Sequence, residues 1–233
     1  MRFAARPGTP LAAVFAIVLA LLPACAVVTD SGGGGSTGTT QEPIDRVDAD
    51  SLAEDVRGAV GATDAFWREA FPDEFRRSYR PPRVAGGYRG RNGPRCDGQP
   101  PVPFNAFYCP DQDLIAWDEN LMAAGYERIG DAWVYLILAH EWGHAIQARL
   151  ESDQVSVAAE LQADCLAGAT LFGAAERGFL TFERGDIEEL QETLSAVADD
   201  YPWTDESDHG NAQQRIAAFN RGAEGGVQDC IPR

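Results

Sequence analysis

The motif His140-Glu141-Trp142-Gly143-His144 places two histidines and a glutamate at the spacing used by zinc-dependent hydrolases. Residues four apart share one face of an α-helix, so both imidazoles can reach one metal ion. The glutamate can then hold the water that the metal activates. Apolar residues flank the motif at 136–139 and 145–146, which predicts a buried helix. We therefore interpret the motif as a zinc site with Glu141 as general base.

A zinc hydrolase needs a third protein ligand and keeps a fourth position for water. Metzincins carry glycine and histidine three and six residues after the motif, but Gln147 and Leu150 follow His144 at these positions. Gluzincins take a glutamate from the next helix, often followed four residues later by an aspartate. Glu160 and Asp164 have this spacing. The sequence therefore predicts Glu160 as the third ligand.

Two helices are expected to position these residues. The first is predicted from about Gly130 to Leu150, and the second from Ser152 or Asp153 to about Gly173. The short connection favours antiparallel packing. His144 and Glu160 each lie eight residues from Ser152, so the glutamate should come level with the histidines.

Asp164 is expected to orient a ligand rather than to bind the metal. Its i, i+4 relation to Glu160 puts it on the same helix face, where it can accept the free N–H of His140. Two carboxylates four apart are most often a solvated face. The residues around this pair are largely apolar, however, and a buried carboxylate needs a metal or a hydrogen-bonded partner.

Hydrophobic periodicity and turn residues predict the other elements. Helices are expected over about 50–71, 186–198 and the residues after His209, and Pro72 is expected to end the first. Extended segments are expected over 83–88, 105–109 and 114–117, the last two joined by a tight turn and leading directly into the metal-binding helix. The predicted fold class is α+β, mostly helical, with a small edge sheet and an antiparallel pair of metal-binding helices.

The amino-terminal residues 1–24 have the features of an export signal. Arg2 and Arg6 precede an apolar run over 11–22, which is short for a membrane span. The run ends in Leu22-Pro23-Ala24-Cys25, which resembles the bacterial lipoprotein box. Cys25 is therefore predicted to carry a lipid that holds the protein at the outer face of the cytoplasmic membrane. Cleavage by an ordinary signal peptidase, giving a secreted or periplasmic protein, is the alternative, and an uncleaved anchor is a weaker one.

Three segments follow from this interpretation: a signal peptide over 1–24, a flexible Gly/Ser/Thr-rich tether over 25–45 and a single catalytic domain over 46–233.

The composition excludes two other kinds of function. Without Arg2 and Arg6, 17 basic residues remain against 36 acidic ones. So acidic a chain is an improbable partner for nucleic acid. The sequence contains no lysine, which excludes Schiff-base chemistry through that side chain.

Four cysteines remain if Cys25 is lipidated, and three disulfide pairings are formally possible. The preferred pairing is Cys96–Cys109 with Cys165–Cys230. The first bond would close a Gly/Pro-rich loop, and the second would tie the C-terminal tail to the helix after the metal motif. A soft-metal cluster is the rival interpretation, but no CxxC spacing supports it.

Four blocks of this sequence, in this order, are similar to the putative neutral zinc metallopeptidases of bacteria, which are usually exported or membrane-anchored. The blocks are Phe107-Tyr108-Cys109-Pro110 with Asp111-Gln112, Leu138-Ala139-His140-Glu141-Trp142-Gly143-His144, Glu160-Leu161-Gln162-Ala163-Asp164-Cys165-Leu166-Ala167-Gly168, and Asp208-His209-Gly210 with Gln214-Arg215. The similarity runs from about Tyr79 to Cys230. It departs from the family at the amino end and at Ala116-Trp117.

The resemblance implies a zincin-like fold and peptide hydrolysis, with zinc ligands His140, His144 and Glu160 and with Glu141 as the base. His209 resembles the late His-Gly of the family, so it either stabilises the tetrahedral oxyanion or caps the helix that starts near Asn211. Tyr108 and Tyr201 are weaker candidates for the same role. The zincin resemblance also makes 114–117 a hypothetical edge strand for an extended peptide.

The predicted function is therefore an exported, membrane-tethered zinc metalloendopeptidase that acts on peptide or protein substrates. A zinc hydrolase or amidase acting on cell-envelope material would use the same site chemistry. A non-catalytic zinc-binding surface lipoprotein is the third hypothesis. The presence of Glu141 argues against it, because a structural site has no use for a base and tends to have four protein ligands.

Overall fold

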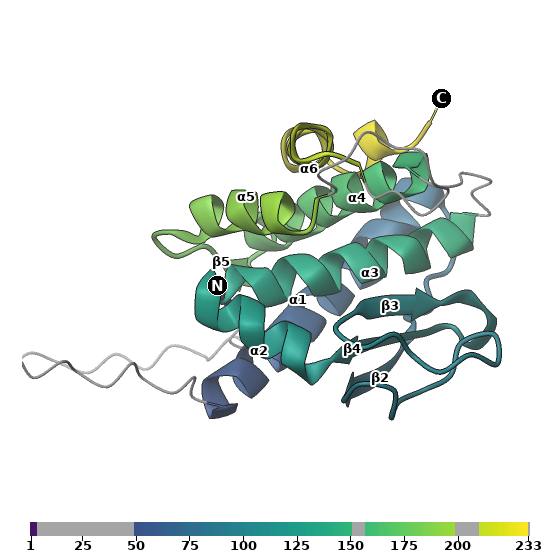
Figure 1. Ribbon diagram of the computed structural model, residues 1–233. Helices are drawn as coiled ribbons and strands as arrows, with labels where there is room; N and C mark the ends of the chain where they lie inside the picture. The colour runs from purple at the N-terminus through teal and green to yellow at the C-terminus, as the bar shows by residue number, and fades with distance from the viewer. Residues whose placement is uncertain (4–48, 151–156, 199–209, 233) are drawn as a thin grey trace, which may run out of the picture. The chain divides into compact units, whose positions relative to one another are not determined.

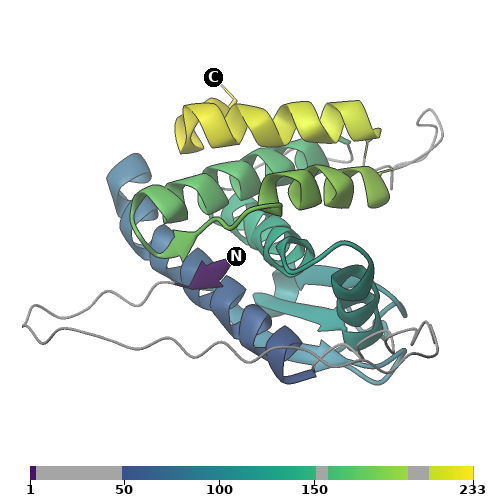
Figure 2. The same cartoon turned by 90° about the vertical axis from the view of Figure 1, so that its left-hand side faces the viewer.

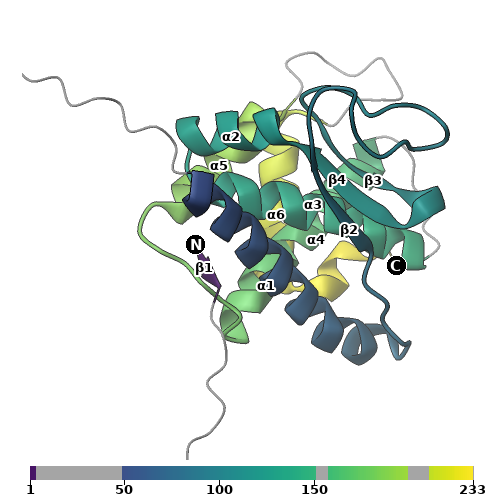
Figure 3. The ribbon, with the colours of Figure 1, turned by 90° about the horizontal axis from the view of Figure 1, so that it is seen from below.

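Helix α3 (Ala132–Leu150), which carries the HExxH motif, lies at the centre of the structure. The computed structural model describes residues 1–3, 49–150, 157–198 and 210–232. Every residue from Ala132 to Gln147 other than His144 is buried. A helix that is apolar nearly all round must be covered on all sides. Accordingly, α4 and α5 pack on one side of α3, and α1 and a small sheet lie next to each other on the other (Figures 1 and 3).

The fold is α+β and mostly helical, as predicted. Besides α3, the helices are α1 (Ala49–Phe75), α2 (Glu119–Arg128), α4 (Val157–Glu176), α5 (Asp186–Ala196) and α6 (Ala212–Gly225), with 3-10 turns η1 (Pro110–Gln112) and η2 (Val227–Cys230). The strands are β1 (Arg2–Phe3), β2 (Arg83–Tyr88), β3 (Ala106–Cys109), β4 (Leu114–Asp118) and β5 (Leu180–Thr181). Among the described residues, no helix combines the length and the apolar character needed to cross a membrane.

The three-stranded sheet has the order β2-β4-β3. Strand β4 is buried throughout and pairs parallel with β2 and antiparallel with β3. The turn between β3 and β4 is the tight connection predicted from the sequence. However, β4 is the central strand, so the hypothesis that 114–117 forms the edge was wrong. The edge strands are β2 and β3. Strand β4 is central because β2, formed by the distant segment 83–88, pairs with its other side.

Asp118 connects this sheet to the neighbouring loops. Its buried carboxylate accepts hydrogen bonds from the backbone N–H groups of Gly90, Phe104 and Asn120, the last of which caps α2. Burial acts to raise the pKa of Asp118, but these hydrogen bonds lower it, so the carboxylate stays ionised. One side chain thus holds the 102–105 loop, the end of β4 and the start of α2 together.

Two features of the fold differ from the sequence-based prediction, the end of α1 and the presence of α2. Helix α1 continues through Pro72 to Phe75, because the Phe71 ring packs against both Phe75 and Tyr79, with centroids 4.9 and 5.6 Å apart. These contacts stabilise a last turn that proline alone would disfavour. Helix α2 was not predicted, and it separates β4 from α3, so the strands do not lead directly into the metal-binding helix.

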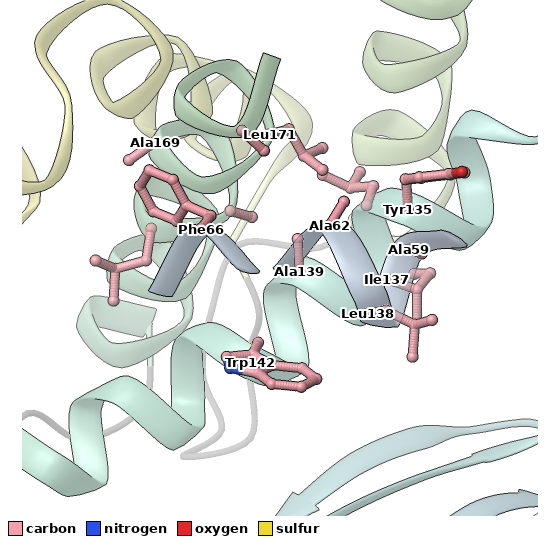
Figure 4. Close-up of a cluster of buried hydrophobic side chains, with 14 of the residues drawn as sticks. Ala59, Ala62, Phe66, Tyr135, Ile137, Leu138, Ala139, Trp142, Ala169 and Leu171 are labelled. Carbon is pink, nitrogen blue, oxygen red and sulfur yellow. The ribbon is translucent and has the colours of Figure 1, made fainter. Parts of the chain in front are cut away.

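The main core lies where α1, α3 and α4 meet. Phe66, Ala62 and Ala59 of α1 face Ala139 and Trp142 of α3, with Leu171 of α4 nearby (Figure 4). The apolar residues whose helical spacing predicts this helix also belong to the core, since Trp67 and Phe71 are buried and Val56 and Val60 pack against the cluster. Trp142 also donates its indole N–H to the hydroxyl of Tyr79, at 2.8 Å, which ties the segment after α1 to the HExxH helix.

Glycines allow α6 to lie close against α4 (Figure 2). A Cβ atom at Gly222 would lie 1.8 Å from the carbonyl oxygen of Cys165, and one at Gly168 would lie 2.1 Å from that of Phe219. No side chain fits at these distances. The structure contains both preferred disulfides, and Cys165–Cys230 joins α4 to the turn that follows α6, while Cys96–Cys109 closes the loop before β3.

The first three residues pack against the domain. Strand β1 pairs antiparallel with β5, and the Met1 ammonium group forms ion pairs with Asp131 and Asp186. Cleavage of the predicted signal peptide would remove these contacts from the mature chain. The cleavage site, Cys25 and the predicted tether lie outside the described residues.

Candidate metal centre

The two histidines of α3 and Glu160 of α4 bring three donor atoms together. The Nε2 atoms of His140 and His144 are 3.2 Å apart. Oε2 of Glu160 lies 3.2 Å from Nε2 of His140, and its Oε1 lies 3.4 Å from Nε2 of His144. Ligands at zinc bond lengths of roughly 2.0–2.2 Å in a tetrahedron are separated by roughly 3.3–3.6 Å. The two Glu160 contacts use different carboxylate oxygens, but one donor atom from each of the three residues lies within 4.8 Å of the others. The donor types and their proximity therefore fit zinc.

The approach of α3 to α4 makes this arrangement possible. Contacts pair His140 with Asp164 and Gln147 with Ala159, so residue numbers rise along one helix as they fall along the other. The helices are thus antiparallel, as predicted. Between these contacts, a Cβ atom at Gly143 would lie only 2.9 Å from the Ala163 carbonyl oxygen. The glycine inside the motif therefore lets the helices come close enough for Glu160 to reach both histidines.

Asp164 lies behind His140. Its Oδ1 is 2.9 Å from Nδ1 of His140, so this ring nitrogen donates to the carboxylate and Nε2 is directed toward the other donors. Arg215 of α6 donates to both oxygens of Asp164, at 2.8 and 2.9 Å, and to the carbonyl oxygen of Val197. Asp164 and Arg215 are 0% and 4% exposed, so this ion pair is buried.

The charges in this cluster favour an ionised Asp164. Burial acts to raise its pKa, but His140 and the Arg215 guanidinium hold it below its usual range. For His140, burial acts to lower the pKa, yet the hydrogen bonds with Asp164 and Glu160 raise it to about 10. Without a metal, His140 is therefore protonated at neutral pH, and a metal ion must displace that proton.

Arg215→Met should destabilise the protein strongly, because it leaves the buried Asp164 carboxylate with only His140 as a charged partner. Breaking a buried ion pair lowers the free energy of unfolding by about 3–5 kcal/mol. Urea titration of the full chain would measure this change. Arg221→Met is the matched control, because Arg221 is an exposed residue of the same helix. A free energy of unfolding for Arg215→Met equal to that of the control would contradict the assigned role.

Glu141 lines a cavity of about 720 Å³ together with the three candidate ligands. It is 8% exposed, and within the described part of the chain no hydrogen bond engages its carboxylate. Its position next to His140 on α3 places it beside the space that the three donor atoms face. A water molecule there could be held and deprotonated by this carboxylate.

Strand β3 forms another wall of the cavity. Asn105, Ala106, Phe107, Tyr108 and Pro110 line it, opposite the residues of α3 and α4. In the described part of the structure β3 pairs with β4 on one side only, and residues of this edge strand line the cavity. The strand that meets the site is therefore β3 rather than the segment 114–117.

Arg149 fixes this wall against α3. Its guanidinium donates to both carboxylate oxygens of Asp113, at 2.8 and 3.0 Å, and to the Arg80 carbonyl oxygen. The turn η1 comes directly after β3, and Asp113 is the next residue. Asp113 also accepts a hydrogen bond from the Tyr108 hydroxyl at 3.0 Å. Tyr108 thus contributes to the cavity wall, while its hydroxyl is engaged by Asp113 rather than directed to an oxyanion.

The remaining candidates for oxyanion stabilisation, His209 and Tyr201, lie outside the described residues. Sequence reasoning assigned no structural role to three buried polar residues: Arg215 and Gln147, which line the cavity, and Gln162, which contacts Gln147. A signal for the first was present, because Arg215 belongs to the last of the four blocks that resemble the metallopeptidase family. Gln147 was considered only as the residue that excludes a metzincin.

Comparison with known proteins also indicates a zinc site. A family model described as "Putative neutral zinc metallopeptidase" matches residues 12–231. Two curated relatives, both called Uncharacterized protein YpfJ, come from Escherichia coli strain K12 and from an O6:H1 strain. Each is 29% identical to this chain over 206 residues, which covers 76% of this chain and 69% of the relative. No solved structure matches the chain significantly.

Proposed function

Because the chain belongs to the putative neutral zinc metallopeptidase family, we propose that it is a zinc endopeptidase that cleaves peptides in the cavity between α3, α4 and β3. The observation that carries this proposal is the spacing of the three donor atoms of His140, His144 and Glu160, with Glu141 beside them. Three protein ligands leave one position for water and substrate, whereas structural zinc sites close with four.

The side chains around the ligands have defined parts in this reaction. A bound zinc ion would polarise the peptide carbonyl and make water acidic. Glu141 takes the proton from the attacking water and delivers it to the leaving amine. Asp164, held by Arg215, keeps the Nδ1 proton of His140 in place, so that Nε2 remains the donor.

The edge of β3 supports a peptide as the substrate. An extended chain can add to a free strand edge through main-chain hydrogen bonds. We propose that the substrate lies along β3, so that the peptide bond to be cleaved lies beside Glu141 and the residues that would hold the metal. This mode favours an extended polypeptide over the compact cross-linked material that an envelope amidase would take.

The test of this function is cleavage of a peptide library by the purified full chain. We expect cleavage that stops when a chelator removes the metal and returns after addition of about one equivalent of zinc. Products would be identified by mass spectrometry, and a chelator already saturated with zinc serves as the control. Cleavage that persists in the metal-free chain would contradict a zinc peptidase.

We further propose that the protein is exported and held at the outer face of the membrane through a lipid on Cys25, with 25–45 as the tether. The supporting observations are the basic residues and the apolar run that precede Cys25. The intact mass of the chain purified from its membrane would reveal an amino terminus at a lipidated Cys25. An unmodified Cys25 would exclude the anchor.

A further inference from the structure

Two buried amide side chains connect the second histidine of the motif to the C-terminal segment. Oε1 of Gln147 lies 2.9 Å from Nδ1 of His144. Nε2 of Gln147 donates to the Ala159 carbonyl oxygen at 2.6 Å and to Oε1 of Gln162 at 3.1 Å. Nε2 of Gln162 in turn donates to the Cys230 carbonyl oxygen at 2.9 Å. We call this chain of contacts the glutamine relay.

The direction of the relay is fixed by its backbone ends. The carbonyl oxygens of Ala159 and Cys230 can only accept hydrogen bonds. Each glutamine must therefore turn its NH₂ group toward its carbonyl, which leaves Oε1 of Gln147 facing His144. An amide oxygen also only accepts, so Nδ1 of His144 must carry the proton. Its Nε2 then has a free lone pair, as a metal ligand requires.

Burial makes this arrangement informative. Gln147 and Gln162 are only 8% and 5% exposed, and burying an amide is unfavourable unless its hydrogen bonds are satisfied. Residues 145 and 146, just before Gln147, are apolar and fully buried. A third apolar residue at position 147 would fill the space without an amide to desolvate. The glutamine therefore has specific partners to satisfy, and His144 is the one that belongs to the metal site.

The far end of the relay is held by a covalent bond. Cys230 ends the 3-10 turn η2, and its disulfide with Cys165 anchors this turn to α4. Cys165 directly follows Asp164, which orients the first histidine. The same short stretch of α4 thus supports both histidines, through a carboxylate for His140 and through the anchored tail and the glutamine relay for His144.

We propose that Gln147 is a positioning residue, oriented by Gln162 and the Cys230 carbonyl group, that fixes the tautomer and ring orientation of His144. This inference rests on the proposed zinc site. It assigns the C-terminal segment and its disulfide a part in zinc affinity, although neither contributes a ligand. The two histidines are therefore held differently, His140 by a charged group and His144 by a neutral amide.

The test compares zinc affinities of full-length variants by competition with a chromophoric chelator. Gln147→Leu should weaken zinc binding by about 10–100-fold, the usual effect of losing a partner of a ligand histidine. Gln162→Leu should weaken it less, because Gln147 keeps the Ala159 carbonyl as a guide. Gln191→Leu is the matched control, because Gln191 lies exposed on α5, away from the relay and from η2. Its affinity should equal that of the wild type.

A second measurement does not depend on how the variants fold. Long-range ¹⁵N–¹H spectra of the zinc-loaded wild type, which has only three histidines, report the protonated ring nitrogen of each. The relay requires a proton on Nδ1 of His144. A His144 without that proton, or a folded Gln147→Leu with wild-type zinc affinity, would overturn the inference while leaving the zinc site intact. A wild type that binds no zinc would instead refute the proposed function.

Discussion

Replacement of Glu141 by glutamine is expected to lower the rate of peptide cleavage by roughly 10²–10⁴-fold, the contribution of a well-placed general base. The amide keeps the size of the side chain but cannot accept the water proton. Glu141 is not one of the three residues whose ligand atoms lie close together, so the variant should still bind one zinc ion. The rate would be measured on a peptide that the wild type cleaves.

Zinc content of the same preparation separates this effect from loss of the site. Glu192→Gln provides the control, because this glutamate is exposed on α5 and touches neither the ligands nor the cavity. A zinc-loaded Glu141→Gln that cleaves at the wild-type rate would show that another group acts as the base.

Replacement of Glu160 by alanine is expected to weaken zinc binding by about 10²–10³-fold. Structural zinc sites with four protein ligands bind with roughly 10–16 kcal/mol, so each ligand contributes about a quarter of that, and we expect a similar contribution from Glu160. The alanine variant keeps both histidines of α3, so it isolates the contribution of α4. Zinc affinity would again be measured by chelator competition.

The exposed Glu176, at the end of the same helix, supplies the control variant Glu176→Ala. We expect this variant to bind zinc as the wild type does. If Glu160→Ala also kept the wild-type affinity, the third ligand would have to come from another residue, and the gluzincin interpretation would fail.

The two metal-binding helices were predictable because their signals are local, whereas α2 was not predicted. The i, i+4 spacing of the motif and the short connection after Leu150 were enough to bring Glu160 level with His140 and His144. Apolar residues on both sides of each motif indicated burial, and the structure places both α3 and α4 in the core. In α3 and α4 the same helical spacing predicts both the helix and which of its residues can be ligands.

The sheet and the supporting polar residues depend on contacts between distant segments. Strand β4 becomes central only because β2, about 30 residues earlier, pairs with it. No local pattern in 105–117 shows which of β3 and β4 is the edge. Arg215 meets Asp164 across 51 residues, and Gln162 meets Cys230 across 68. Such contacts follow from the packing of α6 on α4, which periodicity alone does not specify.

X-ray absorption at the zinc edge of the purified full chain, together with its zinc content, tests the central claim most directly. The proposed site predicts one zinc ion per chain with only nitrogen and oxygen neighbours at roughly 2.0–2.2 Å. All four described cysteines are in disulfides, so no sulfur should contribute. A chain without zinc, or zinc with sulfur neighbours near roughly 2.3 Å, would contradict the assignment of His140, His144 and Glu160.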